Sequence, residues 1–156
     1  MLDNCKSLQE RWGGVSEIID RWLQARKKIL VSYIELSNTP AFDSDNSDHG
    51  VKLQEMCELL VDYISAGHFE VYQQLMEEGR AFGDQDALNE AHELLTQIHV
   101  ATQSALDFND KYLETDDLES LAKDLSELGE TLESRFEVED RMIEVLHNAH
   151  QGIVAS

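Results

Sequence analysis

Long segments of this chain repeat apolar residues every three to four positions, and proline occurs only once, at Pro40. Such a recurrence places apolar side chains along one face of an α-helix, whereas a half-buried strand alternates at every second residue. Little alternation of that kind is present. The sequence therefore predicts an all-α protein. Its 156 residues are a suitable length for one domain, residues 1–156, around one hydrophobic core.

Glycine and proline divide this pattern into one short helix and four long ones. Gly13-Gly14 is expected to interrupt a short N-terminal helix over about 2–11, and the stretch 37–40 ends the helix that follows. The long helices are expected over about 15–36, 51–78 and 86–113, and from about 118 to 146. Because the connections are short, neighbouring helices should be antiparallel, which is the arrangement of an up-and-down four-helix bundle.

The helix expected over 51–78 carries two apolar faces. Its inward stripe recurs at helical spacing and consists of Leu53, Cys57, Leu60, Ile64, Val71 and Leu75. At about 100° per residue, a neighbouring strip that points elsewhere consists of Asp62, Ser65, Phe69, Tyr72 and Met76. A helix needs only one apolar face to join a core, so the second strip suggests a surface that meets another macromolecule. The alternative is a small satellite core beneath the N-terminal helix.

Net charge restricts the class of partner. The chain has 12 Lys and Arg residues against 32 Asp and Glu residues, which gives a formal charge of −20. A negative field repels nucleic acid and anionic membranes and attracts basic proteins. The acidic residues could equally serve solubility or tolerance of a salty cytoplasm, and the sequence does not decide between this explanation and partner binding.

Cysteine content and hydropathy indicate the compartment. Cys5 and Cys57 are the two cysteines, which is too few for a disulfide framework. No apolar run has the length of a signal peptide or a membrane span. We expect a protein of the reducing cytoplasm that does not enter membranes.

Four polar residues fall within or beside the apolar faces of their helices. On the helical projection they are Arg26, His68, Arg135 and Glu139. Unpaired, each would be costly in a core, so we expect an interior polar network. The alternative is that the long side chains extend to the surface.

Metal binding and catalysis find little support in the sequence. Di-iron bundles need two Glu-x-x-His pairs, and the chain has one, at Glu144 and His147, followed by His150. His68-Phe69 and the stretch 136–140 resemble part of the hemerythrin signature, but that signature has histidine where this chain has Arg135, which cannot ligate a metal. No nucleophile, phosphate-loop or dinucleotide motif is present. We therefore predict a protein that is not an enzyme and has neither metal nor cofactor, with His147 and His150 placed favourably near a helix C-terminus.

Three segments stand in the order and spacing of one known family. They are Ile19-Asp20-Arg21-Trp22-Leu23 with Arg26-Lys27 after it, Leu60-Val61-Asp62-Tyr63-Ile64-Ser65-Ala66-Gly67-His68-Phe69-Glu70-Val71-Tyr72, and Leu132-Glu133-Ser134-Arg135-Phe136-Glu137-Val138-Glu139-Asp140. They resemble the hallmark segments of the regulator of sigma D family, the Rsd/AlgQ anti-sigma factors. Three separate matches in order rarely arise from helical composition alone.

The resemblance implies a helical bundle that binds the C-terminal promoter-reading domain of the primary sigma factor of RNA polymerase. Such binding withholds the sigma factor from the core enzyme and the promoter, and favours alternative sigma factors when growth slows. The resemblance places the contacts at Asp62, Ser65, Phe69 and Tyr72, with Arg21 as an additional contact. We expect stoichiometric sequestration by a monomer or weak dimer.

Two alternatives remain open at this point. One is a hemerythrin-like bundle that senses a metal or oxygen. The other is an acidic adaptor for another regulatory protein, because relatives of this family also engage a phosphocarrier protein or a stringent-response enzyme.

Overall fold

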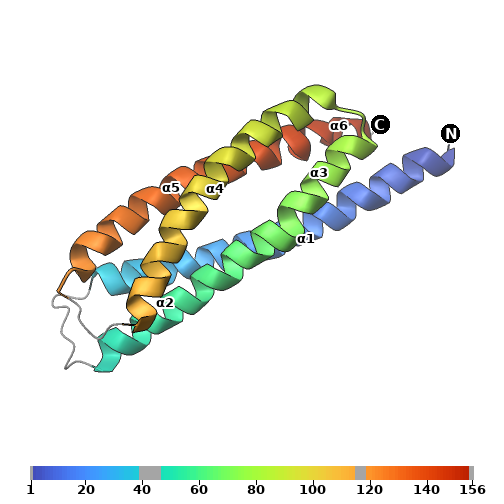
Figure 1. Cartoon of the computed structure of the whole chain (residues 1–156). Coiled ribbons are helices and arrows are strands. Elements are labelled where there is room, and N and C mark those ends of the chain that lie inside the picture. Colours follow the sequence, from blue (N-terminus) through green and yellow to red (C-terminus); the bar gives the residue numbers. More distant parts are fainter. Residues whose placement is uncertain (1, 39–46, 115–118, 155–156) are drawn as a thin grey trace.

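The computed structural model describes residues 2–38, 47–114 and 119–154, and every regular element within them is helical (Figure 1). The elements are α1 (Leu2–Ser37), α2 (Ser47–Ala66), the π-helical turn η1 (Gly67–Val71), α3 (Tyr72–Ala81), α4 (Gln85–Glu114), α5 (Leu121–Leu146), the 3-10 turn η2 (Asn148–His150) and α6 (Gln151–Val154). The prediction of an all-α protein is confirmed. None of the described helices combines the length and the apolar content that a bilayer span requires.

The long elements lie lengthwise beside one another. Figure 1 shows α2, η1 and α3 as one continuous rod, and the chain reverses direction between α1 and this rod, at the α3–α4 connection and between α4 and α5. The most extensive pairings are α4 with α5 and α1 with α2. The start of α1 and the end of α6 lie at the same end of the molecule in Figure 1, where the side chain of Gln9 donates to the carbonyl oxygen of Val154 at 2.9 Å.

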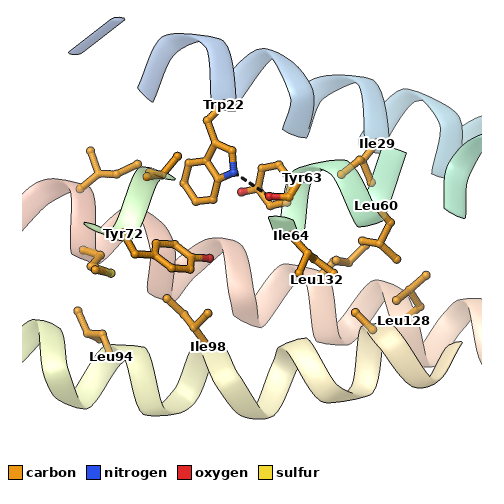
Figure 2. Close-up of a cluster of buried hydrophobic side chains, with 14 of the residues drawn as sticks. Trp22, Ile29, Leu60, Tyr63, Ile64, Tyr72, Leu94, Ile98, Leu128 and Leu132 are labelled. Carbon is orange, nitrogen blue, oxygen red and sulfur yellow. Dashed lines mark hydrogen bonds between the residues drawn. The ribbon is translucent and has the colours of Figure 1, made fainter. Parts of the chain in front are cut away.

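Apolar side chains from every long helix fill the space between the helices. Figure 2 shows part of this core, in which residues of α1, α2, α3, α4 and α5 meet. The indole of Trp22 stacks on the ring of Tyr63 at 4.6 Å between centroids, and its Nε1–H donates to the Tyr63 carbonyl at 3.1 Å. All six residues of the predicted inward stripe are buried.

The expected break at Gly13-Gly14 is wrong, because α1 runs without interruption from Leu2 to Ser37 and no separate short N-terminal helix exists. A glycine inside a helix costs only about 1 kcal/mol relative to alanine. Tertiary contacts on both sides offset that cost, since Trp12 stacks on His147 at 4.3 Å and Val15 is buried.

The turn η1 changes which residues face the core. The backbone N–H of Tyr72 bonds to the carbonyl oxygen of Gly67, five positions earlier, so this turn holds one residue more than an α-helical turn. Every later side chain is thereby rotated by about 100° from its ideal α-helical direction. Tyr72 and Met76, which we expected on the outward strip, are therefore turned inward and are only 4% and 5% exposed.

Gly67 allows two aromatic rings to pack against this turn. A Cβ atom at position 67 would lie 3.0 Å from the ring carbon Cζ and the hydroxyl of Tyr72, and 3.1 Å from Cζ2 of Trp22. Those distances are shorter than ordinary van der Waals contacts, so a larger residue would push the rings away. The absence of a side chain at position 67 thus accommodates the inward position of Tyr72.

Candidate functional site

Three of the predicted contact residues remain accessible on α2 and η1, the first two elements of the rod. Asp62 and Phe69 are exposed and Ser65 is half-buried. Phe69 is 71% exposed, more than any other large hydrophobic side chain in the described parts of the chain. We call Asp62, Ser65 and Phe69 the Phe69 ridge. An exposed aromatic side chain among acidic neighbours can contribute apolar burial to a partner that is itself basic.

Arg21, the additional predicted contact, lies on α1 beside this ridge. Its guanidinium is 3.7 Å from the carboxylate of Glu70, the residue that follows Phe69. The two side chains are 75% and 51% exposed, so water screens the pair and it contributes little to stability. Both side chains can therefore rearrange when a partner binds.

Tyr72 does not belong to the ridge, and the structure places it in a buried polar cluster around Glu139. The carboxylate of Glu139 accepts hydrogen bonds from the hydroxyls of Tyr63 at 2.8 Å and Tyr72 at 2.6 Å. The guanidinium groups of Arg135 and Arg26 lie 3.4 and 3.6 Å from the same carboxylate. The cluster thus joins α1, α2, α3 and α5, and we call these five residues the Glu139 network.

The two arginines of this network have different surroundings. Arg135 is 1% exposed and donates to the Tyr72 hydroxyl at 2.9 Å and to the hydroxyl of Thr102 on α4. Arg26 donates to the Tyr63 hydroxyl at 3.0 Å and to the exposed carboxylate of Asp140 at 2.6 Å. Arg135 is therefore enclosed by the bundle, whereas Arg26 connects the network to the surface.

Burial governs the protonation of the network. Removal from water raises the pKa of Glu139, and Arg135 and the two hydroxyl donors oppose this rise. Burial also raises the pKa values of Tyr63 and Tyr72, so both phenols keep their protons and remain donors. The network is thus a set of matched donors and acceptors that fixes the relative positions of its helices.

Three of the four residues predicted for an interior network, Arg26, Arg135 and Glu139, are brought together, but His68 is not among them. Its ring is exposed, makes an edge contact with the ring of Phe69 at 4.9 Å, and lies 6.2 Å from the ring of His99. The prediction for His68 is wrong because a regular helical projection does not account for the π-helical turn in which it lies. Tyr63, which the sequence analysis missed, could have been found from its place beside the inward stripe, since a buried tyrosine hydroxyl needs a partner.

Two further polar pairs, not predicted from the sequence, lie at the end of the molecule where α1 begins and α6 ends. Nδ1 of His147 is 2.9 Å from both carboxylate oxygens of Glu78, and both side chains are almost fully buried. Nε2 of His150 is 2.9 Å from Asp84, and its ring stacks on Phe82. These pairs connect α3 and the turn after it to the residues that follow α5. The two histidines therefore do more than lie near a helix C-terminus, which is the role expected from the sequence.

A metal site does not emerge from these contacts. Within residues 2–38, 47–114 and 119–154, no group of three or more His, Cys, Asp or Glu side chains is placed to hold a metal ion. His147 faces Glu78, whereas Glu144, its expected partner in a metal motif, lies 3.4 Å from Arg141. The described residues therefore offer the hemerythrin-like alternative no ligand set.

Known proteins that resemble this chain belong to one family. Residues 1–147 match the family model described as "Regulator of RNA polymerase sigma(70) subunit, Rsd/AlgQ". The chain is 35% identical to the regulator of sigma D of Salmonella arizonae over 158 aligned positions, which cover 97% of this chain and 96% of that protein. It is 36% identical to the regulator of sigma D of Shigella boydii serotype 4 over 148 positions, which cover 92% of each.

These matches extend over nearly the whole chain and include both the Phe69 ridge and the Glu139 network. The chain therefore belongs to the Rsd/AlgQ family of regulators of the RNA polymerase sigma(70) subunit.

Proposed function

We propose that this protein is an anti-sigma factor that binds the C-terminal promoter-reading domain of the primary sigma factor through the Phe69 ridge. It acts in the cytoplasm by stoichiometric sequestration, as one up-and-down bundle domain that is a monomer or weak dimer. The observation that carries the proposal is the 71% exposure of Phe69, which lies within the residues that match the family model. An aromatic side chain of this size left in water is an apolar anchor available to a partner.

Charge supports the choice of partner. A helix-turn-helix domain that reads promoters presents a basic face to DNA phosphates. This chain has a formal charge of −20, and Asp62 in the ridge and Glu70 beside it are acidic. A negative surface of this kind favours encounter with such a basic face and can compete with DNA for it. The acidic side chains then accelerate and orient association with the sigma factor, and burial of Phe69 adds apolar contact.

The interior supports the ridge from behind. Tyr63 and Tyr72 lie before and after Ser65 and Phe69 in sequence, and both are hydrogen-bonded to Glu139 on α5. A rod held at these two points presents Phe69 with little conformational freedom to lose on binding. The network therefore serves as support for the ridge and makes no contact with the sigma factor itself.

The experiment that tests the proposal measures the dissociation constant for the isolated C-terminal domain of the primary sigma factor by titration calorimetry. Phe69→Ala should weaken binding by about tenfold or more, because burial of a phenyl ring contributes about 1.5–3 kcal/mol. Asp62→Arg should also weaken binding, mainly by slowing association, and its effect should diminish as salt rises.

Val100→Ala and Glu133→Arg are the matched controls. Val100 is 69% exposed on α4, and Glu133 is an exposed acid on α5, so each reproduces the chemistry of one test substitution on another helix. Both should bind like the wild type. If folded Phe69→Ala and Asp62→Arg proteins bind no more weakly than the two controls, the proposed face is wrong.

A further inference from the structure

An open pocket lies between the η1–α3 part of the rod and α4, next to the Phe69 ridge. It encloses about 420 Å³, and its polar lining includes His68, Arg80, His92 and His99. That volume is typical of sites that hold a small molecule. We propose that this pocket binds a small organic phosphomonoester.

The charges around the pocket differ from those of the rest of the surface. Arg80 and three of the six histidines of the chain line it, although acids outnumber Lys and Arg by 32 to 12 overall. Glu77 is the one acidic residue in the lining, and its carboxylate lies 3.7 Å from the guanidinium of Arg11. Arg80 itself makes no ion pair with any residue that the structure describes. The pocket therefore offers donors to an anion on an otherwise acidic surface.

The donors gather in two groups along the pocket. Because α3 and α4 run in opposite directions from the connection that joins them (Figure 1), Arg80 and His92 lie toward that connection. His68 and His99 form the other group, with their ring centroids 6.2 Å apart. His92 and His99 are separated by about 10 Å along α4, at 1.5 Å per residue. This spacing suits a ligand with an anionic group at one end and a planar body at the other.

The lining is also partly apolar, which favours an organic ligand over a bare inorganic anion. Met76 and Tyr72 are buried and Leu95 is half-buried, and all three border the pocket. A phosphate group can take hydrogen bonds from the fork of Arg80 and from His92, while a ring packs on Met76 and Leu95 beside the imidazoles. A cation would be opposed by Arg80, so the same residues do not favour a metal.

The pocket adjoins the ridge through His68, whose ring contacts that of Phe69 at 4.9 Å. A ligand held there is positioned to affect the ridge. Direct ligand binding can nevertheless be measured without a sigma factor, so failure of this proposal and failure of the proposed function are distinguishable.

The test is a titration of the full-length protein with phenyl phosphate, followed by the NMR signals of the histidine rings. We expect saturable shifts of the His68, His92 and His99 signals, and smaller shifts of the buried His147 and His150. Arg80→Ala should weaken binding by about tenfold, the effect expected for one charge-assisted hydrogen bond. His92→Ala, at a second exposed position, should weaken it in the same direction and guards against a folding defect in the first variant.

Arg141→Ala is the matched control, because Arg141 is an exposed arginine on α5, 2.8 Å from Glu90 and outside the pocket lining. It should bind phenyl phosphate like the wild type. The proposal is overturned if no saturable shift occurs, or if Arg80→Ala and His92→Ala both bind as well as Arg141→Ala. Equal affinity for inorganic phosphate at matched ionic strength would overturn the assignment of an organic ligand.

Discussion

The Phe69 ridge and the Glu139 network draw on the same short stretch of chain, yet they occupy opposite environments. Phe69 is 71% exposed, whereas Tyr72, three residues later, is 4% exposed and bonded to Glu139. In a regular helix, residues three apart share a face. The π-helical turn of η1 separates them, so one segment both presents an aromatic side chain to solvent and ties itself to the core. A local change in helical geometry therefore places an exposed aromatic side chain close in sequence to one that is bound in the core.

Charge removal at the centre of the network should have the largest effect on stability. Glu139→Gln leaves Arg135, which is 1% exposed, without a carboxylate partner in the core. We expect the free energy of unfolding, measured by urea denaturation, to fall by about 3–5 kcal/mol, as for other broken buried ion pairs.

Asp140→Asn is the control for that substitution. Asp140 is 59% exposed and also pairs with Arg26, so its loss should cost about 1 kcal/mol or less. Equal costs for the two variants would show that the buried network is no more important to stability than an exposed ion pair.

The close packing at the η1 turn, which separates the Phe69 ridge from the Glu139 network, can be tested by substitution of Gly67. In Gly67→Ala the new Cβ atom would lie about 3.0 Å from the Tyr72 ring and 3.1 Å from Trp22, so the rings or the turn must shift. We expect a loss of about 1–3 kcal/mol in the free energy of unfolding, the range for overpacked cores.

Gly14→Ala provides a matched control inside α1, because nothing lies within 4 Å of its Cβ position. It should stabilise the protein by about 0.5–1 kcal/mol through helix propensity alone. If Gly67→Ala were equally stabilising, close packing of the rings at this glycine would not be required.

A smaller effect on stability is expected at the pair of His150 and Asp84, which is neither fully buried nor fully exposed. The hydrogen bond between His150 and Asp84, together with the backbone N–H of Ala87, lowers the pKa of Asp84 below its ordinary value. A carboxyl whose folded pKa is depressed adds stability above its unfolded pKa of about 3.9, and that stability is lost as the pH falls through the folded pKa.

Asp84→Asn lacks this contribution. The difference in thermal unfolding midpoint between the wild type and Asp84→Asn should therefore be larger at about pH 5 than at about pH 2. A difference that stays constant over this range would show that the charge on Asp84 contributes nothing. Because the Asp84 side chain is 35% exposed, its effect should remain below that of Glu139→Gln.

Helical periodicity was sufficient to predict the parts of the fold in which the helices are regular. All six residues of the inward stripe predicted for the second long helix are buried, and the angular positions of Arg26, Arg135 and Glu139 correctly predict that they lie inside. A spacing of about 100° per residue is enough when no residue is inserted or omitted.

The errors have two physical causes. Tyr72, Met76 and His68 were misplaced because one extra residue in η1 alters the angular positions of the side chains in and after the turn. The pairs formed by His147 and His150 were missed because they depend on the axial offset between neighbouring helices. Sequence periodicity within a helix carries no information about that displacement, so these contacts required the assembled bundle.

The most direct test of this division compares two substitutions three residues apart, Phe69→Ala and Tyr72→Phe, for affinity to the C-terminal domain of the primary sigma factor. We predict that Phe69→Ala weakens binding by about tenfold or more and leaves the free energy of unfolding nearly unchanged. Tyr72→Phe should lower the free energy of unfolding by about 1–3 kcal/mol, because Glu139 loses a donor, and the folded protein should lose much less affinity than Phe69→Ala. Wild-type affinity in Phe69→Ala, or an equal loss of affinity in folded Tyr72→Phe, would contradict the account.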